Sequence, residues 1–401
     1  MSSSSQTSEV RIVFVTGPGD LNAAYKSWER HDADKSSFGG EFLEEFFEES
    51  KRLNATCHLI SPLPGVTARH PNYYLEHRPY PLPNASGIIY HLVQIYYLLG
   101  VALTAIKFKA NLLMVTPSRP YWFVLCFLPP FGIKILPSLH CALWPKFQKK
   151  PRSVIVQFFF QLTRFFYCHS CIAMLTASED IAVQIRALTK GKNKPLFGFL
   201  PTYKPQDFNH FQIPEHSTSP FRILFVGRVE ATKGIYSIIE LAHRFSRENH
   251  QIEFHICGIG SALEDFSQKV KDNNLESSVI IHGFCYKPVL LQIYQQAHAV
   301  IIPTTTEFGE GFNRVVVESI LSYRPVITSA VCIPVESHLD DAVIQVPPND
   351  IPAYGNAIAE LYKSQEYYNQ KVQGCQSVRS QFLNPVNSWG YQFKTILENF
   401  F

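Results

Sequence analysis

The sequence at residues 310–318 reads EGFNRVVVE, which places two carboxylates eight positions apart around the start of a helix. The short apolar run 300–303 predicts a buried strand before it, and the apolar positions after Asn313 repeat as on one face of a helix. A polar loop between strand and helix carries Glu310, and the second turn of the helix carries Glu318. The same alternation of strand and helix patterns along the rest of the chain favours α/β domains with parallel sheets.

The amino end of this helix predicts a site for an anion. Backbone N–H groups at Phe312, Asn313 and Arg314 would point toward the carboxyl end of the strand, where the helix dipole favours a group such as a diphosphate. Glu310 would lie beside that anion, and the Glu318 carboxylate could accept hydrogen bonds from both hydroxyls of a ribose. Two carboxylates this close to a phosphate need cations supplied from elsewhere in the chain.

Those cations are found upstream, in a turn that follows the apolar strand pattern 222–226. The strand ends at Gly227 and Arg228, and Lys233 and Gly234 open the next helix. Arginine offers a planar fork and lysine a compact charge, and together they can hold a leaving diphosphate. Taken alone, this segment is best interpreted as a tight turn with two solvated cations. Its combination with residues 310–318 favours a binding site.

Both segments resemble the nucleotide-sugar half of retaining glycosyltransferases with the type B (GT-B) fold, family 4. In that family a Gly-Arg-x4-Lys-Gly turn and a Glu-x7-Glu stretch face the donor. The resemblance implies that Arg228 and Lys233 neutralise the departing diphosphate, and that Glu310 holds the sugar hydroxyls while Glu318 holds the ribose. It implies the following donor-binding residues in this half of the chain: Gly227, Gly258, Gly283, Phe284, Gly311, Phe312, Asn313, Arg314 and Glu318.

The amino-terminal half resembles the family less closely. Gly39 and Gly40 match a Gly-Gly-x-Glu loop that lies against the donor phosphates, where glycines let backbone N–H groups approach closely. His140 follows the strand pattern 134–139 and matches a histidine that faces the donor sugar or its phosphate. The resemblance thus implies four catalytic residues, His140 with Arg228, Lys233 and Glu310, and no metal or cofactor besides the nucleotide-sugar donor.

Three positions depart from the family pattern. Asn313 stands where a glycine is common, and Arg324 replaces a glycine before Pro325. The segment 200–203 replaces a Pro-Asn-Gly turn. None of these changes removes a charged group from the implied site, so activity is still expected. The identity of the donor, however, is harder to infer from the family resemblance.

The fold that the resemblance implies is α/β of GT-B type, with two doubly wound Rossmann-like domains facing a central cleft. The length of 401 residues, with 46% hydrophobic and 17% charged residues, suits two globular domains. We expect residues 1–200 to form an acceptor-side domain, preceded by a disordered tail at 1–9. Residues 201–220 are the expected linker and 221–384 the nucleotide-sugar domain, and a helix within 385–401 is expected to return to the first domain.

The charge distribution is asymmetric. From His77 to Ser178 there is no Asp or Glu, although this stretch carries ten Lys and Arg residues and many of the aromatic residues. Basic charge with exposed aromatics suits an anionic membrane surface, so we expect peripheral membrane contact through residues 78–164. The alternative is that the aromatics form the core of the first domain and the cations are solvated. Residues 87–106 could span a bilayer by length, but His91 and Gln94 favour a buried or interfacial helix.

Other partners and sites are less favoured. A nucleic-acid surface would need a recognition motif, and none accompanies the basic residues. The segment 168–171 resembles half of a metal site, but no second pair lies at a suitable spacing. Asp32 and Asp34 lie in a polar loop and are interpreted as loop or acceptor contacts. Nine cysteines, an odd number, with no signal sequence before them, predict a reducing cytoplasm, with membrane association on its cytoplasmic face.

The family resemblance implies a retaining transferase that moves a hexose from a nucleotide-diphosphate sugar, with UDP-sugar expected, to a hydroxyl acceptor. A membrane lipid or lipid-linked glycan is one candidate acceptor, and a small soluble molecule is the other. A non-catalytic nucleotide-sugar-binding regulatory subunit is the alternative from another class. A dehydrogenase is disfavoured because the segment 17–19 lacks the third glycine of a dinucleotide fingerprint.

Overall fold

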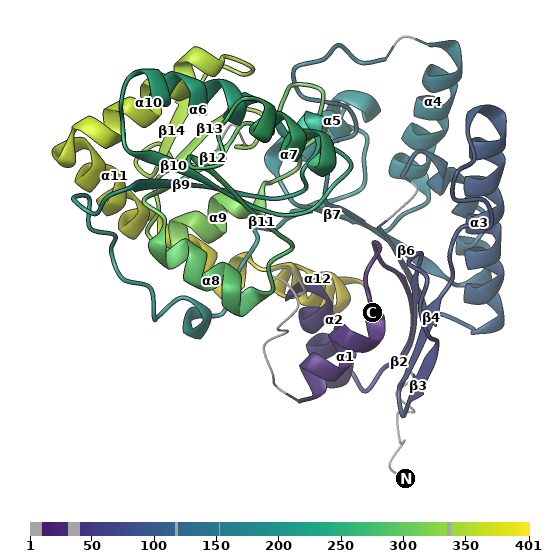
Figure 1. The fold of residues 1–401 in the computed structure, drawn as a ribbon. Coiled ribbons are helices and arrows are strands. Elements are labelled where there is room, and N and C mark those ends of the chain that lie inside the picture. The colour runs from purple at the N-terminus through teal and green to yellow at the C-terminus, as the bar shows by residue number, and fades with distance from the viewer. Residues whose placement is uncertain (1–9, 31–40, 117–118, 152, 335–337) are drawn as a thin grey trace.

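The computed structural model describes residues 10–30, 41–116, 119–151, 153–334 and 338–401. The chain forms two sheets of largely parallel strands, each with helices on both faces, and the two sheets belong to two α/β domains (Figure 1). This arrangement confirms the predicted fold class of two doubly wound domains.

The sheet of the first domain has the strand order β3-β4-β2-β1-β5-β6-β7-β8, and all neighbours are parallel except β3 and β4. The central strand β1 is apolar and inaccessible from residue 12 to residue 15, as a strand covered on both faces requires. The strands are β1 (Arg11–Val15), β2 (Thr56–Ser61), β3 (Ala68–His70), β4 (Tyr73–His77), β5 (Leu112–Val115), β6 (Lys134–Leu139), β7 (Met174–Thr176) and β8 (Leu196–Gly198).

Helices cover both faces of this sheet, with α1 and α2 on one side and α3 on the other (Figure 1). The Asp20 carboxylate caps α1 by accepting hydrogen bonds from the amides of Asn22 and Ala23. The helices are α1 (Leu21–Glu29), α2 (Glu41–Arg52), α3 (Gly87–Lys107), α4 (Val154–His169) and α5 (Glu179–Thr189), with short 3₁₀ turns η1 (Arg119–Leu125) and η2 (Pro129–Phe131).

The last helix, α12 (Trp389–Phe400), packs into the core of the first domain. Trp389 stacks on Phe14 of β1 with ring centroids 6.1 Å apart, and Phe393 stacks on Phe46 of α2 at 6.0 Å. The carboxyl-terminal end of the chain therefore belongs structurally to the first domain.

The sheet of the second domain is fully parallel, with the order β11-β10-β9-β12-β13-β14. Because β10 lies on one side of β9 and β12 on the other, the chain reverses its direction of winding between β9 and β12. Ligands of such sheets bind outside the carboxyl ends of the strands at this switch point. The strands are β9 (Phe221–Val226), β10 (Ile252–Cys257), β11 (Val279–Gly283), β12 (Ala299–Ile302), β13 (Val326–Ser329) and β14 (Val343–Val346).

Within the described residues, six helices surround the second sheet, and the connection from the first domain packs on them. Tyr203, Phe208 and Phe211 of this connection share a core with residues of α8 and α9. The helices are α6 (Ser237–Arg247), α7 (Leu263–Asp272), α8 (Lys287–Gln296), α9 (Arg314–Leu321), α10 (Ile351–Lys363) and α11 (Gln365–Val378), with 3₁₀ turns η3 (Pro205–Asp207), η4 (Ala231–Lys233), η5 (Arg379–Phe382) and η6 (Pro385–Asn387).

The aromatic residues of the basic stretch that follows His77 are of two kinds, buried and exposed. Trp122, Phe166 and Tyr167 are inaccessible and belong to the core, whereas Tyr96 and Phe158 are 69% and 59% exposed. Within the described residues, α3 is the one helix long and apolar enough to cross a membrane, and 39% of its most apolar window is buried in the protein. Core packing therefore explains some of these aromatics and leaves the others on the surface.

A pH dependence of folding is predicted from His298, which precedes β12 and is 2% exposed. Its Nδ1 accepts a hydrogen bond of 2.9 Å from the amide of Arg222, and burial lowers its pKa from 6.5 to about 4. In the unfolded chain His298 therefore takes up a proton near pH 6.5, whereas in the folded chain it stays neutral until about pH 4. The stability that is present above pH 6.5 is therefore lost as the pH falls toward 4. We expect urea unfolding to show a loss of about 2–3 kcal/mol from this group between about pH 7 and pH 4.5.

The variant His298→Asn keeps an acceptor for Arg222 and should lose less stability over that pH range than the parent protein. His243→Asn, on α6 where the side chain contacts Asn273, is the matched control and should retain the parent's pH dependence. Equal pH slopes in the parent and in His298→Asn would remove His298 as the cause.

Candidate active site

Close backbone contacts bring the turn after β9 against the loop after β12. Gly234 has a φ of +75°, and a Cβ there would lie 1.9 Å from the carbonyl oxygen of Pro303. The amide of Thr305 donates a 3.0 Å hydrogen bond to the carbonyl of Thr232. Only glycine at position 234 allows the backbone to come this close to Pro303. As a result, Lys233 reaches the loop that carries Glu310.

Lys233 and Glu310 form an ion pair at the switch point of the sheet. Lys233 Nζ lies 2.7 Å from Glu310 Oε2, and the two side chains are only 14% and 11% exposed. Asn313 Nδ2 donates to the same carboxylate oxygen at 3.1 Å, while Asn313 Oδ1 caps α9 by accepting from the amide of Val315. The residue that departs from the family's glycine therefore serves as a helix cap and fixes the position of Glu310.

An aromatic ring lies beside both cations of the predicted site. Lys233 Nζ is 3.7 Å from the ring centroid of Phe308, and the Arg228 guanidinium is 5.4 Å from it. Arg228 is 57% exposed and pairs with Glu230 at 2.8 Å. Phe308 was not among the residues predicted from the sequence, in which it is a single aromatic residue within a polar loop.

Glu318 is buried, with 4% of its surface exposed, and its carboxylate already accepts hydrogen bonds. The hydroxyl of Tyr203 donates to Glu318 Oε1 at 2.7 Å, and the hydroxyl of Tyr294 lies 3.5 Å from Oε2. Arg314 in turn donates to the Tyr203 hydroxyl from Nε and Nη2, at 3.1 and 3.0 Å. A ribose that binds Glu318 must therefore share this carboxylate with Tyr203 or displace Tyr203 from it. Tyr203 belongs to the segment 200–203, which replaces the family's Pro-Asn-Gly turn.

Three predicted glycines lie together at the carboxyl ends of β9, β10 and β11. A Cβ on Gly258 would lie 1.7 Å from the carbonyl oxygen of Gly227, and the Gly258 amide donates to the carbonyl of Gly283 at 2.7 Å. Next to these glycines, Ile259 and Phe284 are 54% and 52% exposed. Exposed apolar side chains at a strand end suit the flat face of a nucleotide base.

His140 of the first domain lies against Gly311 of the second. A Cβ on Gly311 would come within 2.2 Å of the His140 carbonyl oxygen, so the two backbones are in contact. The His140 ring lies 2.9 Å from Ser138 Oγ through Nε2, and Ser138 Oγ accepts a 3.0 Å hydrogen bond from Trp389 Nε1 of α12. The returning helix therefore helps to hold His140 at the boundary between the two domains.

Gly311→Ala is predicted to displace one domain from the other without unfolding either. The added methyl group would overlap the His140 backbone. We expect the rate of the transfer reaction that the family resemblance implies to fall by about tenfold or more, because a misplacement near 1 Å is costly in catalysis. Gly309→Ala is the matched control, since its Cβ would lie at an ordinary 3.7 Å from the carbonyl oxygen of Ala142. Steady-state kinetics of both variants test the prediction, and equal rates for the two would contradict it.

A cleft of about 450 Å³ lies beside His140, and most of its lining comes from the first domain. Phe312 and Arg314 line it from the second domain, so the cleft adjoins the amino end of α9. Its walls are mainly apolar and include Phe42, Phe199 and Trp389. This space is suited to a ligand that carries apolar groups.

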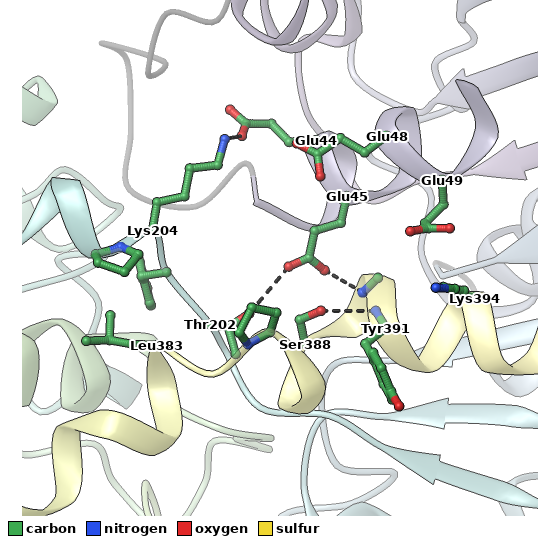
Figure 2. Close-up of a pocket in the computed structure, with 14 residues that line it drawn as sticks. Glu44, Glu45, Glu48, Glu49, Thr202, Lys204, Leu383, Ser388, Tyr391 and Lys394 are labelled. Atoms are coloured by element: carbon green, nitrogen blue, oxygen red, sulfur yellow. Dashed lines mark hydrogen bonds and ion pairs between the residues drawn. The ribbon is translucent and has the colours of Figure 1, made fainter. Parts of the chain in front are cut away.

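A second cavity, of about 330 Å³, lies between α2, the interdomain connection and α12 (Figure 2). Glu45 accepts hydrogen bonds from Thr202 Oγ1 at 3.3 Å and from the amide of Gly390, and Glu44 pairs with Lys204 at 2.7 Å. Four glutamates line this cavity, at positions 44, 45, 48 and 49. So many carboxylates would repel a diphosphate, so this cavity is not suited to an anionic ligand.

Some predicted residues cannot be placed. Gly39 and Gly40, the Asp32 and Asp34 pair and the tail at 1–9 lie outside the described residues. Within the described part of the chain, no group of three or more His, Cys, Asp or Glu side chains is arranged to hold a metal ion.

This chain is similar to known glycosyltransferases in both sequence and structure. Residues 206–374 match the model of the family described as Glycosyl transferases group 1. A stretch of 114 residues is 27% identical to the poly(ribitol-phosphate) alpha-N-acetylglucosaminyltransferase of Staphylococcus aureus, and it covers 28% of this chain and 22% of that protein. The alpha-D-kanosaminyltransferase of Streptomyces kanamyceticus is 27% identical over 146 residues, which are 36% of this chain and 37% of that protein.

Solved structures match over nearly the whole chain. Anabaena HepE in complex with UDP and glucose gives a TM-score of 0.66 at 15% identity, covering 98% of this chain and 99% of its own. The curated relatives, by contrast, are matched over only 22% to 37% of their own length. Residues 206–374 therefore resemble the group 1 glycosyl transferases, and the chain as a whole has the GT-B fold.

Proposed function

We propose that this protein transfers a hexose from a UDP-sugar to a hydroxyl acceptor, with retention of configuration at the anomeric carbon. The observation that carries the proposal is the Lys233–Glu310 pair, 2.7 Å apart and nearly buried at the switch point of the second sheet. An ordinary surface ion pair would be solvated and would contribute little. Here the pair lies at the amino end of α9 and close to His140 of the facing domain, where a donor sugar would be enclosed.

The proposed donor lies along the carboxyl ends of β9 to β12. The base would contact the glycine loops near Gly258 and Gly283, and the ribose would reach Glu318. Lys233 and Arg228 would bind the diphosphate, while Glu310 and His140 would orient the hexose from opposite domains. HepE, a structural relative, was solved with UDP and glucose, which supports a UDP-sugar as the first donor to test.

The proposed reaction breaks the bond between the anomeric carbon and the diphosphate oxygen while the acceptor oxygen bonds to the same carbon. As the family resemblance implies, the acceptor approaches from the face of the leaving group and its proton passes to the diphosphate oxygen. No side-chain nucleophile is required. The negative charge that grows on the diphosphate is stabilised by Lys233 and Arg228, and the nearly buried Lys233 is already held in place by its pair with Glu310.

The acceptor is proposed to be an amphiphilic alcohol, such as a lipid-linked sugar or a glycolipid. The 450 Å³ cleft beside His140 has a mainly apolar lining, which favours such a molecule over a fully polar one. The proposed location is the cytoplasm, and all nine cysteines, each within the described residues, are free thiols. A small soluble acceptor and a non-catalytic regulatory role are the alternatives.

The test is an assay of the purified protein with UDP-sugars and with both lipid and soluble alcohols as acceptors. NMR of the product gives its anomeric configuration, and an α-linked donor should yield an α-linked product. A β-linked product would contradict retention. Binding of UDP-sugar without transfer to any acceptor would favour the regulatory role.

A further inference from the structure

Helix α3 exposes an apolar stripe on the face that points away from its own domain. The stripe consists of Ile89, Leu92, Tyr96, Leu99 and Leu103, whose spacings of three and four residues place them on one side of the helix. Their exposed fractions lie between 41% and 69%. The opposite side of α3 is buried against the domain through residues that include Val93, Tyr97 and Val101. A helix that is apolar on both sides is expected to be covered on both sides.

Helix α4 extends this apolar surface. Figure 1 shows α3 and α4 at the same outer side of the first domain, and His91 of α3 stacks on Phe159 of α4 with centroids 5.2 Å apart. On α4, Val154 and Phe158 are 84% and 59% exposed, and Phe165 is 54% exposed. Single exposed apolar residues are common, but two neighbouring helices lined with them form a continuous patch, which marks an interaction surface.

The charged residues within the part of the sequence that forms this patch are all positive. No Asp or Glu occurs between His77 and Ser178, the stretch that contains both helices. Lys107 follows the α3 stripe by one further turn and is exposed, and Lys149 is exposed shortly before α4. An anionic partner with an apolar layer beneath its charges would match both the apolar patch and the positive charges. A protein partner would more often present carboxylates that pair with particular lysines.

We propose that the α3–α4 face docks on the surface of an anionic lipid bilayer. The exposed side chains of the two helices enter the boundary between headgroups and acyl chains, while Lys107 and Lys149 lie at the level of the lipid phosphates. The helix α3 does not cross the bilayer, because its other side is part of the core of the first domain. This inference rests on the surface itself and does not depend on the transfer reaction.

The experiment is flotation of the full-length protein with vesicles of phosphatidylcholine alone or mixed with phosphatidylglycerol. We expect binding to the anionic vesicles at low ionic strength, and a loss of most of that binding in neutral vesicles or in roughly 0.5 M salt. Leu92→Glu combined with Leu99→Glu should lower the partition coefficient by at least about tenfold, and Lys107→Gln by about fivefold.

The matched control is Ile213→Glu combined with Val289→Glu, which places the same charges on exposed apolar positions of the interdomain connection and of the second domain. It should bind vesicles as the parent does. An unchanged melting temperature and an unchanged far-ultraviolet circular dichroism spectrum show that the Leu92 and Leu99 variant is folded. The proposal is overturned if the parent fails to float with anionic vesicles at low salt, or if the Leu92 and Leu99 variant floats as well as the parent. It is also overturned if the parent is a dimer that this variant dissociates, since the face would then belong to a second copy of the chain.

Discussion

Lys233→Ala is expected to lower kcat/KM of the transfer reaction by about 100-fold or more, the largest effect of any single substitution in the donor site. The ammonium lies 3.7 Å from the ring centroid of Phe308 and is only 14% exposed, so it would bind the diphosphate where water is largely excluded. Removing it should also weaken UDP binding by about 1.5–3 kcal/mol, the usual range for a charge-assisted hydrogen bond. Steady-state kinetics and calorimetric titration with UDP measure the two effects. Undiminished transfer by the variant would contradict the assignment.

Two further variants separate the role of Lys233 from the loss of an ion pair. Glu310→Gln breaks the same pair but frees the ammonium and removes a charge that repels the diphosphate, so it should bind UDP more tightly while transfer falls. Lys269→Ala removes an exposed lysine of α7 that pairs with Asp265, and it should leave both properties unchanged. If Glu310→Gln and Lys233→Ala weakened UDP binding equally, the pair would be structural.

Arg324→Met is expected to lower the free energy of unfolding by about 3–5 kcal/mol, the largest effect outside the site. Arg324 is inaccessible, and burial lowers its pKa to about 10. Its guanidinium donates to the carbonyls of Gln212 at 2.8 Å, Gln295 at 2.6 Å and Ala297 at 3.1 Å, and also to that of Ser322. One side chain therefore joins the interdomain connection to the ends of α8 and α9, and methionine would leave these buried carbonyls without its donors.

Arg324→Lys is the informative companion, since lysine keeps the charge but reaches fewer of the carbonyls. It should fall between the parent protein and the methionine variant. Urea unfolding followed by near-ultraviolet circular dichroism measures the change. A loss below about 1 kcal/mol in Arg324→Met would mean that the carbonyls find other partners at little cost.

The strands and the site segments could be predicted because they depend on local patterns. Apolar runs mark the buried strands, so the turn at 227–234 and the polar loop that carries Glu310 were each predicted to follow a strand and were together predicted to form a binding site. The structure shows that they meet through Gly234 and Pro303. What the sequence could not provide was the partner of each side chain.

The unpredicted contacts join segments that are distant in the chain. Tyr203 reaches Glu318 across 115 positions, and neither residue type signals the other. Arg324 was noted only as a departure from a family glycine, and its four carbonyl partners follow from the packing of the connection on α8 and α9. Whether the aromatics of α3 and α4 were core or surface also stayed open, because both sides of these helices are apolar and only packing shows which side is covered.

The measurement that tests the central claim most directly is a thermal-shift titration of the purified protein with UDP, GDP, ADP and CDP in the presence of a metal chelator. A ligand that binds only the folded protein raises its melting temperature. The proposed donor site predicts that UDP raises it without any metal ion, that the other nucleotides do so weakly, and that Lys233→Ala loses the response. No stabilisation by any nucleotide, or stabilisation by UDP that Lys233→Ala retains in full, would contradict the site described here.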